Sequence, residues 1–337
     1  MRQAGSDELH NNYQGVRRYT KTMKPYAFGV DIGGTTVKIG FFTTEGKFLD
    51  HWEIPTRKEG DGEMILPDIA RAITKKLYEK DLSLNDLEGV GVGVPGPVLA
   101  DGVVNKCVNL GWGILDVKGQ LSSLLSGVPV EVGNDANVAA LGEQWNGGGK
   151  GHPNVVMVTL GTGVGGGIIL GGKILAGAHG AAGEIGHMKV RENEPEFCGC
   201  GKQGCLEQYG SATGVVRLAK RALAANPAMD TPLRSLDPLT AKDVFDYAKR
   251  GDEMSLAVVE DVGKMLGEAI AHITCVIDPD VVVIGGGVSK AGQILLDAIH
   301  KYYTPAAFHA SRQSDFKLAV LGNDAGMYGA VRMILNK

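Results

Sequence analysis

The sequence lacks three features that would place the protein in a membrane, outside the cell or on nucleic acid. No apolar run reaches 18 residues, the length at which a segment becomes a candidate membrane-spanning helix. Residues 1–22 contain no apolar core of a secretory signal. Lys and Arg number 34 against 38 Asp and Glu, so the formal net charge is −4. Without a net positive field, we expect no nucleic-acid partner, and we expect no membrane partner.

Cysteine is scarce, and its distribution argues against a disulfide framework. Of the five cysteines, Cys198, Cys200 and Cys205 crowd into eight residues between glycines, whereas Cys107 and Cys275 stand alone. The alternative interpretation is three free, buried cysteines, but free cysteines would have no reason to lie so close together in the sequence. Together with the upstream His187, the three make a Cys₃His set, which is the tetrahedral donor set of structural zinc. We therefore expect a Zn²⁺ site in a protein of the reducing cytoplasm.

Glycine is abundant, with 50 of 337 residues, and it gathers beside apolar strands. DIGGTT at 31–36 and LGTGVGGG at 160–167 both read as strand–turn–strand loops, in which glycines let consecutive backbone N–H groups face an anion. Neither is a Walker P-loop or a Rossmann fingerprint, since those open a helix. Two such loops facing each other across a cleft would hold a triphosphate, with Asp31 holding Mg²⁺ through water. A third run at 285–289 is either an ordinary strand–helix turn or a platform for an adenosine.

Apolar periodicity predicts an α/β protein made of two similar halves. Strands are expected at 27–31, 37–42, 48–54, 89–94, 128–132, 155–160, 164–170, 173–176, 281–285 and 316–321. Helices are expected at 63–80, 116–125, 135–145, 211–224, 240–250, 253–277, 290–302 and from 325 onward. We expect a small lobe of residues 23–134 plus 322–337, and a large lobe of residues 135–321 that carries the zinc site. A cleft between such lobes is a natural ligand site.

Residues 133–137, Gly-Asn-Asp-Ala-Asn, follow a predicted strand and open a predicted helix. An aspartate at this place commonly caps the helix, because its carboxylate accepts a backbone N–H. The other interpretation directs Asp135 into the cleft beside the phosphate loops, where it takes the proton of a hydroxyl nucleophile.

Residues 1–22 are polar and aperiodic. Arg17, Arg18, Lys21 and Lys24 would suit a basic arm or a transit peptide, but the composition is typical of an unordered extension. We expect order to begin near Ala27.

The motifs DIGGT, PGP at 95–97, GNDAN, LGTGVGGG, EIGH, CGCGKQGC and VIGGG follow one another along the chain. From about Ala27 onward the chain resembles the ROK family of sugar kinases and sugar-responsive repressors. The cysteine–glycine segment is the most specific signature of that family, and GAAGEIGH at 180–187 resembles its glucokinase branch. The resemblance implies a two-lobed actin-like fold, a duplicated ribonuclease H-like ATPase, with ATP between the lobes.

The resemblance also implies roles for individual residues. Asp135 is the implied general base, acting on the sugar 6-hydroxyl. The implied sugar ligands are Gly96, Asn109, Asn134, Asp135, Glu184, His187 and Glu207. The implied zinc ligands are His187, Cys198, Cys200 and Cys205. From the glycine loops we expect ATP and Mg²⁺ contacts at Asp31, Gly33, Gly34, Thr35, Thr36, Lys38, Gly161, Thr162, Gly163, Gly165, Gly286 and Gly287. Because an imidazole has two nitrogens, we expect His187 to bind zinc with one and a sugar hydroxyl with the other.

The sequence thus predicts an ATP-dependent glucokinase, an ATP:hexose 6-phosphotransferase that forms glucose 6-phosphate and ADP. N-acetylmannosamine, mannose, fructose and allose stay open as substrates, and polyphosphate stays open as the donor. A sugar-responsive repressor would need a winged-helix domain, for which the roughly 26 residues before the first strand are too few. A purely structural actin or chaperone relative would have no use for the His–Cys₃ set. Relatives are usually oligomers, so we expect a homodimer or homotetramer.

Overall fold

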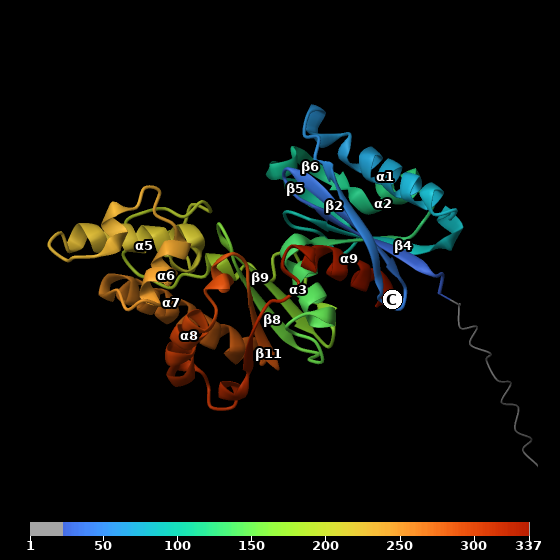
Figure 1. Cartoon of the computed structure of the whole chain (residues 1–337). Coiled ribbons are helices and arrows are strands. Elements are labelled where there is room, and N and C mark those ends of the chain that lie inside the picture. Colours follow the sequence, from blue (N-terminus) through green and yellow to red (C-terminus); the bar gives the residue numbers. More distant parts are fainter. Residues whose placement is uncertain (1–22, 337) are drawn as a thin grey trace, which may run out of the picture.

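Two five-stranded sheets organise residues 23–336, the part of the chain that the computed structural model describes (Figure 1). In spatial order, the first sheet contains β3 (Phe48–Pro55), β2 (Thr36–Thr43), β1 (Tyr26–Ile32), β4 (Leu87–Val94) and β7 (Val130–Asn134). The second contains β10 (Lys173–Ile174), β9 (Val164–Leu170), β8 (Val155–Leu160), β11 (Val281–Gly285) and β12 (Asp315–Leu318). The extension expected at residues 1–22 lies outside the described residues.

The two sheets repeat one topology. In each, the first strand of its half lies at the centre, antiparallel to the second strand and parallel to a later one. β1 pairs in this way with β2 and β4, and β8 pairs in this way with β9 and β11. The two glycine loops occupy equivalent places, each between the first two strands of its half. The duplication predicted from the sequence is therefore confirmed.

The first sheet is covered on its outer face by α1 (Ile65–Glu79) and α2 (Val117–Leu124). Successive strand residues point to opposite faces, so Phe28, Val30 and Ile32 of β1 pack in the cluster that includes these helices. Between them, Gly29 and Asp31 face the other side of the sheet, where α9 (Ala325–Leu335) lies. This alternation is what directs Asp31 toward the space between the lobes.

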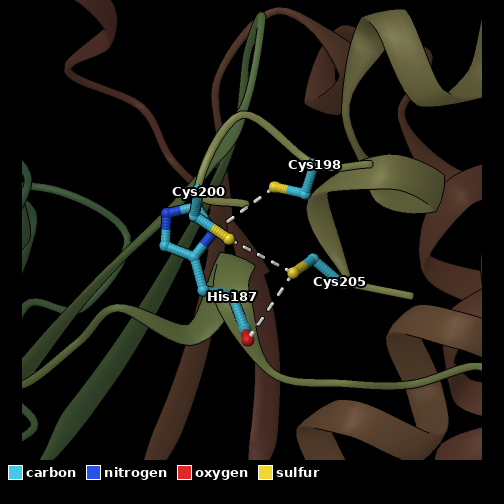
Figure 2. Close-up of side chains that lie close together, drawn as sticks. All are labelled: His187, Cys198, Cys200 and Cys205. Atoms are coloured by element: carbon cyan, nitrogen blue, oxygen red, sulfur yellow. Dashed lines mark hydrogen bonds between the residues drawn. The ribbon is translucent and has the colours of Figure 1, made fainter. Parts of the chain in front are cut away.

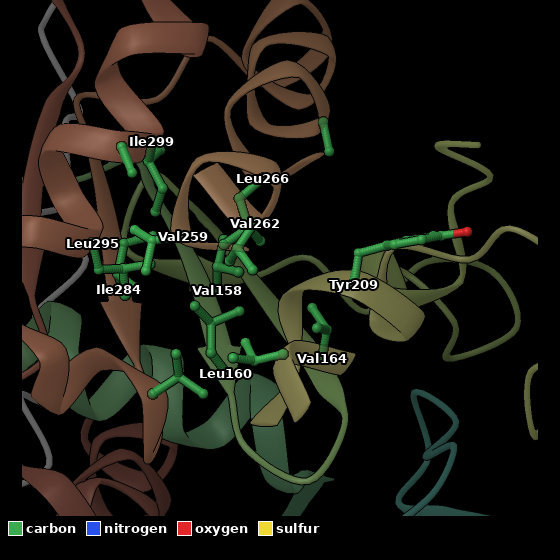
Figure 3. Packing of buried hydrophobic residues seen from close by; sticks show 14 of the residues in the cluster. Val158, Leu160, Val164, Tyr209, Val259, Val262, Leu266, Ile284, Leu295 and Ile299 are labelled. Carbon is green, nitrogen blue, oxygen red and sulfur yellow. The ribbon is translucent and has the colours of Figure 1, made fainter. Parts of the chain in front are cut away.

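In the second sheet, successive strand residues also point to opposite faces. Val156, Val158 and Leu160 of β8 pack with α7 (Glu253–Ile277) and α8 (Gln293–Ala306), as Figure 3 shows for Val158 and Leu160. Val155 and Met157 face the other way and pack with α3 (Asp135–Asn146). The remaining helices of the described residues are α4 (Glu207–Gly210), α5 (Ala212–Ala225) and α6 (Ala241–Ala248). None of the helices within residues 23–336 is both long and apolar enough to cross a membrane.

Helices α3 and α9 lie between the two sheets (Figure 1), and they cross at glycines. A Cβ added at Gly329 would lie 1.7 Å from the Val138 carbonyl oxygen, and one added at Gly142 would lie 2.1 Å from that of Ala325. Helix α9 approaches the first sheet as closely, because a Cβ at Gly91 would lie 1.8 Å from the Ala330 carbonyl oxygen. Side chains at these positions would hold the two lobes apart.

Several boundaries differ from those predicted, and two of these differences have a clear physical reason. The helix expected at 290–302 begins only at Gln293, because Gly292 takes a positive φ of 76° and separates α8 from a short 3₁₀ turn. The strand expected at 316–321 ends at Leu318. Beyond it, the backbone N–H groups of Val320 and Leu321 donate to the buried carboxylate of Glu143 on α3 instead of to a neighbouring strand.

A hairpin of β5 (Val103–Cys107) and β6 (Trp112–Asp116) was not predicted. Its apolar residues do not alternate cleanly between inside and outside: Ile114 is 77% exposed. The hairpin matters for the site because Asn109 lies in the turn that joins its strands.

The α3–α9 crossing generates a stability prediction. Alanine forms helices better than glycine by about 1 kcal/mol, yet we expect Gly329→Ala to destabilise the protein. The added methyl group would overlap the Val138 carbonyl, and overfilling a packed core typically costs about 1–3 kcal/mol. The matched control is Gly113→Ala, since an added Cβ at that position meets no atom within 4 Å. Thermal unfolding of both variants tests this, and equal melting temperatures would contradict the close crossing.

Candidate functional site

A cavity of about 780 Å³ opens between the two lobes. It is bounded by the end of β1, the start of α3, the loop between β8 and β9, and the segment that leads into α9. The residues predicted from the sequence that line this cavity are Asp31, Lys38, Gly96, Asn109, Asn134, Asp135, Gly161, Thr162, Gly163, Gly165, Glu184, His187 and Glu207. Residues from positions 31 to 207 thus meet in one space.

The other predicted nucleotide residues do not line this cavity. Residues 33–36 close a tight turn, in which the Gly33 N–H donates to the Thr36 carbonyl at 2.9 Å. Gly287 instead borders a second cavity of about 300 Å³, together with Ala212 and Phe245. Gly286 has a positive φ of 84°, and a side chain there would meet the backbone of Leu160. The third glycine run therefore packs against the end of the strand that enters the second glycine loop.

Asn134, and not Asp135, is the N-cap of α3. The Asn134 Oδ1 accepts the backbone N–H groups of Ala136 at 3.1 Å and Asn137 at 3.2 Å. Its Nδ2 donates to the Gly96 carbonyl at 3.1 Å, which ties the cap to the other wall of the cavity. The Asp135 Oδ1 accepts the adjacent Ala136 N–H at 2.8 Å, and it does not bond the N–H of a later helix residue as the cap does. The capping interpretation of Asp135 is wrong, and its carboxylate lines the cavity.

Asp135 shares the cavity with the carboxylates of Asp31, Glu184 and Glu207. Burial raises the pKa of Asp135, and the Glu184 carboxylate raises it further, while the Ala136 N–H acts in the opposite direction. Burial, followed by the charge of Asp135, raises the pKa of Asp31 to about 6 although the Lys38 ammonium opposes this. Four carboxylates around one partly desolvated space favour binding of a proton or a cation. Carboxylate oxygens are also the ligands that Mg²⁺ prefers, so Asp31 fits an Mg²⁺ site at this end of the cavity.

His187 and the three clustered cysteines converge on one point, as Figure 2 shows. Their four ligand atoms all lie within 4.8 Å of one another. The Cys200 and Cys205 sulfurs are 3.6 Å apart, and the Cys198 sulfur is 3.7 Å from the His187 Nδ1. Tetrahedral zinc, with its usual bond lengths, places two sulfurs about 3.8 Å apart and a sulfur and nitrogen about 3.6 Å apart. The spacing of the donor atoms therefore fits Zn²⁺.

Burial raises the pKa of Cys198 and Cys205, whereas the Lys202 N–H lowers the pKa of Cys200. Burial, then the neighbouring Cys200 and Cys198, raises the pKa of Cys205 to about 12. Thiols with such a pKa stay protonated near neutrality unless a cation stabilises the thiolates. A bound Zn²⁺ supplies that stabilisation.

The two ring nitrogens of His187 lie on different sides of the residue. Its Nδ1 lies on the cysteine side, whereas its Nε2 lies 3.9 Å from the Glu184 Oε2, and both residues line the cavity. One ring nitrogen is therefore available to a metal held by the cysteines, and the other is available to a ligand in the cavity.

One group of cavity residues was missed by the sequence analysis. Gly322, Asn323, Ala325 and Gly326 line the cavity, and the Lys38 Nζ donates to the Asn323 carbonyl at 3.3 Å. The signal was available, because GNDAG at 322–326 repeats the GNDAN of 133–137. Each copy follows the last strand of its half and opens one of the two central helices.

Comparisons with known proteins agree with the geometry. A model described as the ROK family matches residues 27–337. A glucokinase from Halalkalibacterium halodurans is 45% identical over 307 residues, covering 89% of this chain and 92% of that protein. An N-acetylgalactosamine kinase from Shewanella sp. is 34% identical over 319 residues, covering 90% and 94%.

A solved structure shares the whole architecture. The crystal structure of a ROK family glucokinase from Streptomyces griseus, in complex with glucose and AMPPNP, superposes with a TM-score of 0.70 at 34% identity. The match covers 91% of this chain and 98% of that one. The predicted two-lobed actin-like α/β fold is confirmed, and the chain belongs to the ROK family.

Proposed function

We propose that the protein is an ATP-dependent glucokinase, which transfers the γ-phosphoryl group to the 6-hydroxyl of glucose and yields glucose 6-phosphate and ADP. The observation that carries this proposal is the position of Asp135. Its neighbour Asn134 caps α3, and Asp135 lines the cavity from the first position of that helix. The 45% identity to a glucokinase and the likeness to a glucose complex support glucose as the acceptor.

On the acceptor side, the proposed sugar ligands are Gly96, Asn109, Asn134, Glu184, His187 and Glu207, all of which line the cavity. They would hold the hydroxyls of the sugar so that the 6-hydroxyl faces Asp135. A hydroxyl is a weak nucleophile near neutrality, and phosphoryl transfer depends mainly on positioning and charge stabilisation. Asp135 would accept the hydroxyl proton as the bond to phosphorus forms.

On the donor side, the phosphates would lie against the backbone of residues 161–163, with Asp31 and Lys38 at the opposite wall. Mg²⁺ held near Asp31 would neutralise charge that develops on the transferring phosphoryl oxygens. The cavity beside Gly287 would take the adenosine, since it joins apolar side chains to a glycine backbone. Residues 33–36 would contact the phosphates only if the lobes approach each other.

The Cys₃His site would hold Zn²⁺ in a structural role. With its four protein ligands the metal has no open position, so it offers no Lewis-acid chemistry. Its contribution would be to fix the tautomer and direction of His187, whose Nε2 then donates to a sugar hydroxyl. The reduced cysteine set also supports a cytoplasmic location. Assembly as a homodimer or homotetramer stays a prediction.

A second substrate class has support from one relative, the 34% identical N-acetylgalactosamine kinase. A coupled assay with ATP distinguishes the candidates, using glucose, N-acetylgalactosamine, N-acetylmannosamine, mannose, fructose and allose at equal concentration. We expect the highest kcat/KM with glucose. A higher value with an N-acetylhexosamine would assign the acetamido sugar as substrate, and activity with polyphosphate in place of ATP would change the donor.

We expect Asp135→Asn to abolish most of the activity. The substitution keeps the size and one acceptor but removes the base, and loss of a general base costs about 10²–10⁴ in rate. AMPPNP affinity should stay near normal, because residues 161–163 are unchanged. Glucose affinity should fall only modestly, because an amide still hydrogen-bonds the 6-hydroxyl. The measurements are kcat and the glucose dissociation constant on one preparation.

The duplicated motif supplies a matched control for that variant. Asp324 holds the equivalent place in GNDAG, and it is not among the residues that line the cavity. We expect Asp324→Asn to keep its kcat. If Asp135→Asn retained more than about a tenth of the rate, another group would have to be the base, and Glu184 would be the next residue to test.

The buried Asp31 generates a prediction about pH and stability. Its folded pKa of about 6 lies above the ordinary aspartate value, so between these two values the folded state binds more protons than the unfolded state. The contribution of Asp31 to the free energy of unfolding therefore falls as the pH rises toward 6. Above pH 6 this contribution falls no further. We expect Asp31→Asn to raise the melting temperature at pH 8 but not at pH 4, in buffer without Mg²⁺ or ATP. The same gain at both pH values would show that ionisation of Asp31 is not the cause.

The Cys₃His geometry predicts one zinc ion per chain. Metal analysis of purified Cys200→Ser should show most of the zinc lost, and sugar affinity should weaken by about 10–100-fold because His187 loses its anchor. Cys275→Ser is the control, since Cys275 is exposed on α7 and lies outside the cluster. Normal glucose binding by the zinc-free variant would contradict the two-sided role of His187.

A further inference from the structure

The loop at residues 161–163 joins β8 to β9. On one side it is hydrogen-bonded to residues 207–213, which lie more than 40 residues further along the chain. The Ala212 N–H donates to the Gly161 carbonyl at 2.8 Å, and the Thr213 hydroxyl donates to the Thr162 carbonyl at 2.9 Å. The Val164 N–H at the end of the loop donates to the Glu207 Oε2 at 3.1 Å. Two residues of the loop and the first residue of β9 are therefore held by residues 207–213.

Those residues continue directly from the last cysteine of the Cys₃His set. Glu207 comes two positions after Cys205, and its Oε1 lies 3.6 Å from the Cys198 sulfur. The Gln208 Oε1 accepts the backbone N–H groups of Gly204 at 2.8 Å and Cys205 at 3.1 Å. Next to His187, the Met188 carbonyl accepts the Leu206 N–H at 2.8 Å. The start of the segment and the four metal-site residues are thus one hydrogen-bonded unit.

Ser211 connects the start of the segment to its end. Ser211 is fully buried, and its hydroxyl donates to the Glu207 carbonyl at 2.7 Å. The same oxygen accepts the Gly214 N–H at 3.0 Å, and it lies 3.0 Å from the Thr213 Oγ1. The Ser211 hydroxyl therefore holds the start of α5 (Ala212–Ala225), and with it Thr213 and its bond to Thr162, close to the Glu207 carbonyl.

Steric fit at Gly163 shows how closely the carboxylate and the loop are matched. A Cβ at this position would lie 2.0 Å from the Glu207 Oε2. The glycine thus leaves room for the carboxylate to reach the Val164 N–H. A shift of Glu207 by even part of an ångström would lengthen that bond.

We propose that the Cys₃His site positions the 161–163 loop, and through it the donor phosphates, by way of Glu207, Ser211 and Thr213. This inference rests on the proposed kinase function, in which that loop holds the triphosphate. The metal site then serves both substrates: His187 faces the sugar, and the 207–213 segment holds the loop that faces the nucleotide. Ser211 and Thr213 are positioning residues, because they act through the loop backbone.

The experiment measures AMPPNP affinity by calorimetry in the absence of sugar. We expect Cys200→Ser, which removes one metal ligand, to bind AMPPNP about tenfold more weakly, within the usual range for losing a supporting contact of a site. We expect Thr213→Val to weaken binding about 2–10-fold, the effect of one hydrogen bond, with glucose affinity unchanged. Thr213→Ser keeps the hydroxyl and should restore the affinity.

The control is Thr74→Val, which likewise removes one hydroxyl-to-carbonyl bond, of 2.8 Å to Ala70, but in α1 of the other lobe. It should leave AMPPNP affinity unchanged. The double variant Cys200→Ser, Thr213→Val tests the connection. If both sites act through the same loop, the effect of Thr213→Val shrinks once the metal is lost, whereas independent effects multiply.

The outcomes separate the two proposals. Normal AMPPNP binding by zinc-free Cys200→Ser, or full multiplication in the double variant, overturns this inference and leaves the proposed function in place. Absence of AMPPNP binding by the unaltered protein overturns the proposed function and this inference with it. Should Cys200→Ser fail to fold, the contrast between Thr213→Val and Thr213→Ser still decides, because equal affinities would contradict positioning by that hydroxyl.

Discussion

The close crossing of α3 and α9 is the constraint on which the rest of the site depends. Gly142 and Gly329 let the two helix backbones touch, and Gly29 and Gly91 let α9 lie directly on the first sheet. Both helices begin at the same cavity, so the crossing fixes the distance between Asp135 at one start and Gly326 at the other. Crossings of this kind allow little adjustment, because packed backbones have no side chains that can move aside.

A buried carboxylate reinforces the crossing. Glu143 of α3 is 0% exposed, and it accepts backbone N–H groups from Gly148, Val320 and Leu321. These donors belong to the two segments that leave α3 and enter α9. A buried polar group is costly unless hydrogen bonds satisfy it, and here the backbone itself provides them. The same bonds end β12 early and direct the chain toward the cavity.

Burial that serves the chemistry also works against stability. The cavity gathers Asp31, Asp135 and Glu184, and it raises the pKa of the first two. In the core of an ordinary globular protein, buried carboxylates would lie apart from one another, or each would be paired with a cation. In the proposed kinase, a cation bound with the nucleotide would relieve the repulsion among these carboxylates. On the other side of the cavity, the Cys₃His unit supplies rigidity without adding reactive charge.

The sequence by itself determined the features whose residues are close together or repeated. The Cys₃His set lies within residues 187–205, and the duplicated strand–loop–strand pattern predicted two equivalent sheets, because alternation along a strand is a local property. Only the tertiary structure decided which side chain caps α3, where β12 ends and that GNDAG joins GNDAN at one cavity. Each of these depends on a partner far along the chain, such as Gly96 for Asn134 or Glu143 for Leu321. Local propensity cannot rank such contacts, since their strength comes from burial and geometry that exist only once the lobes have packed.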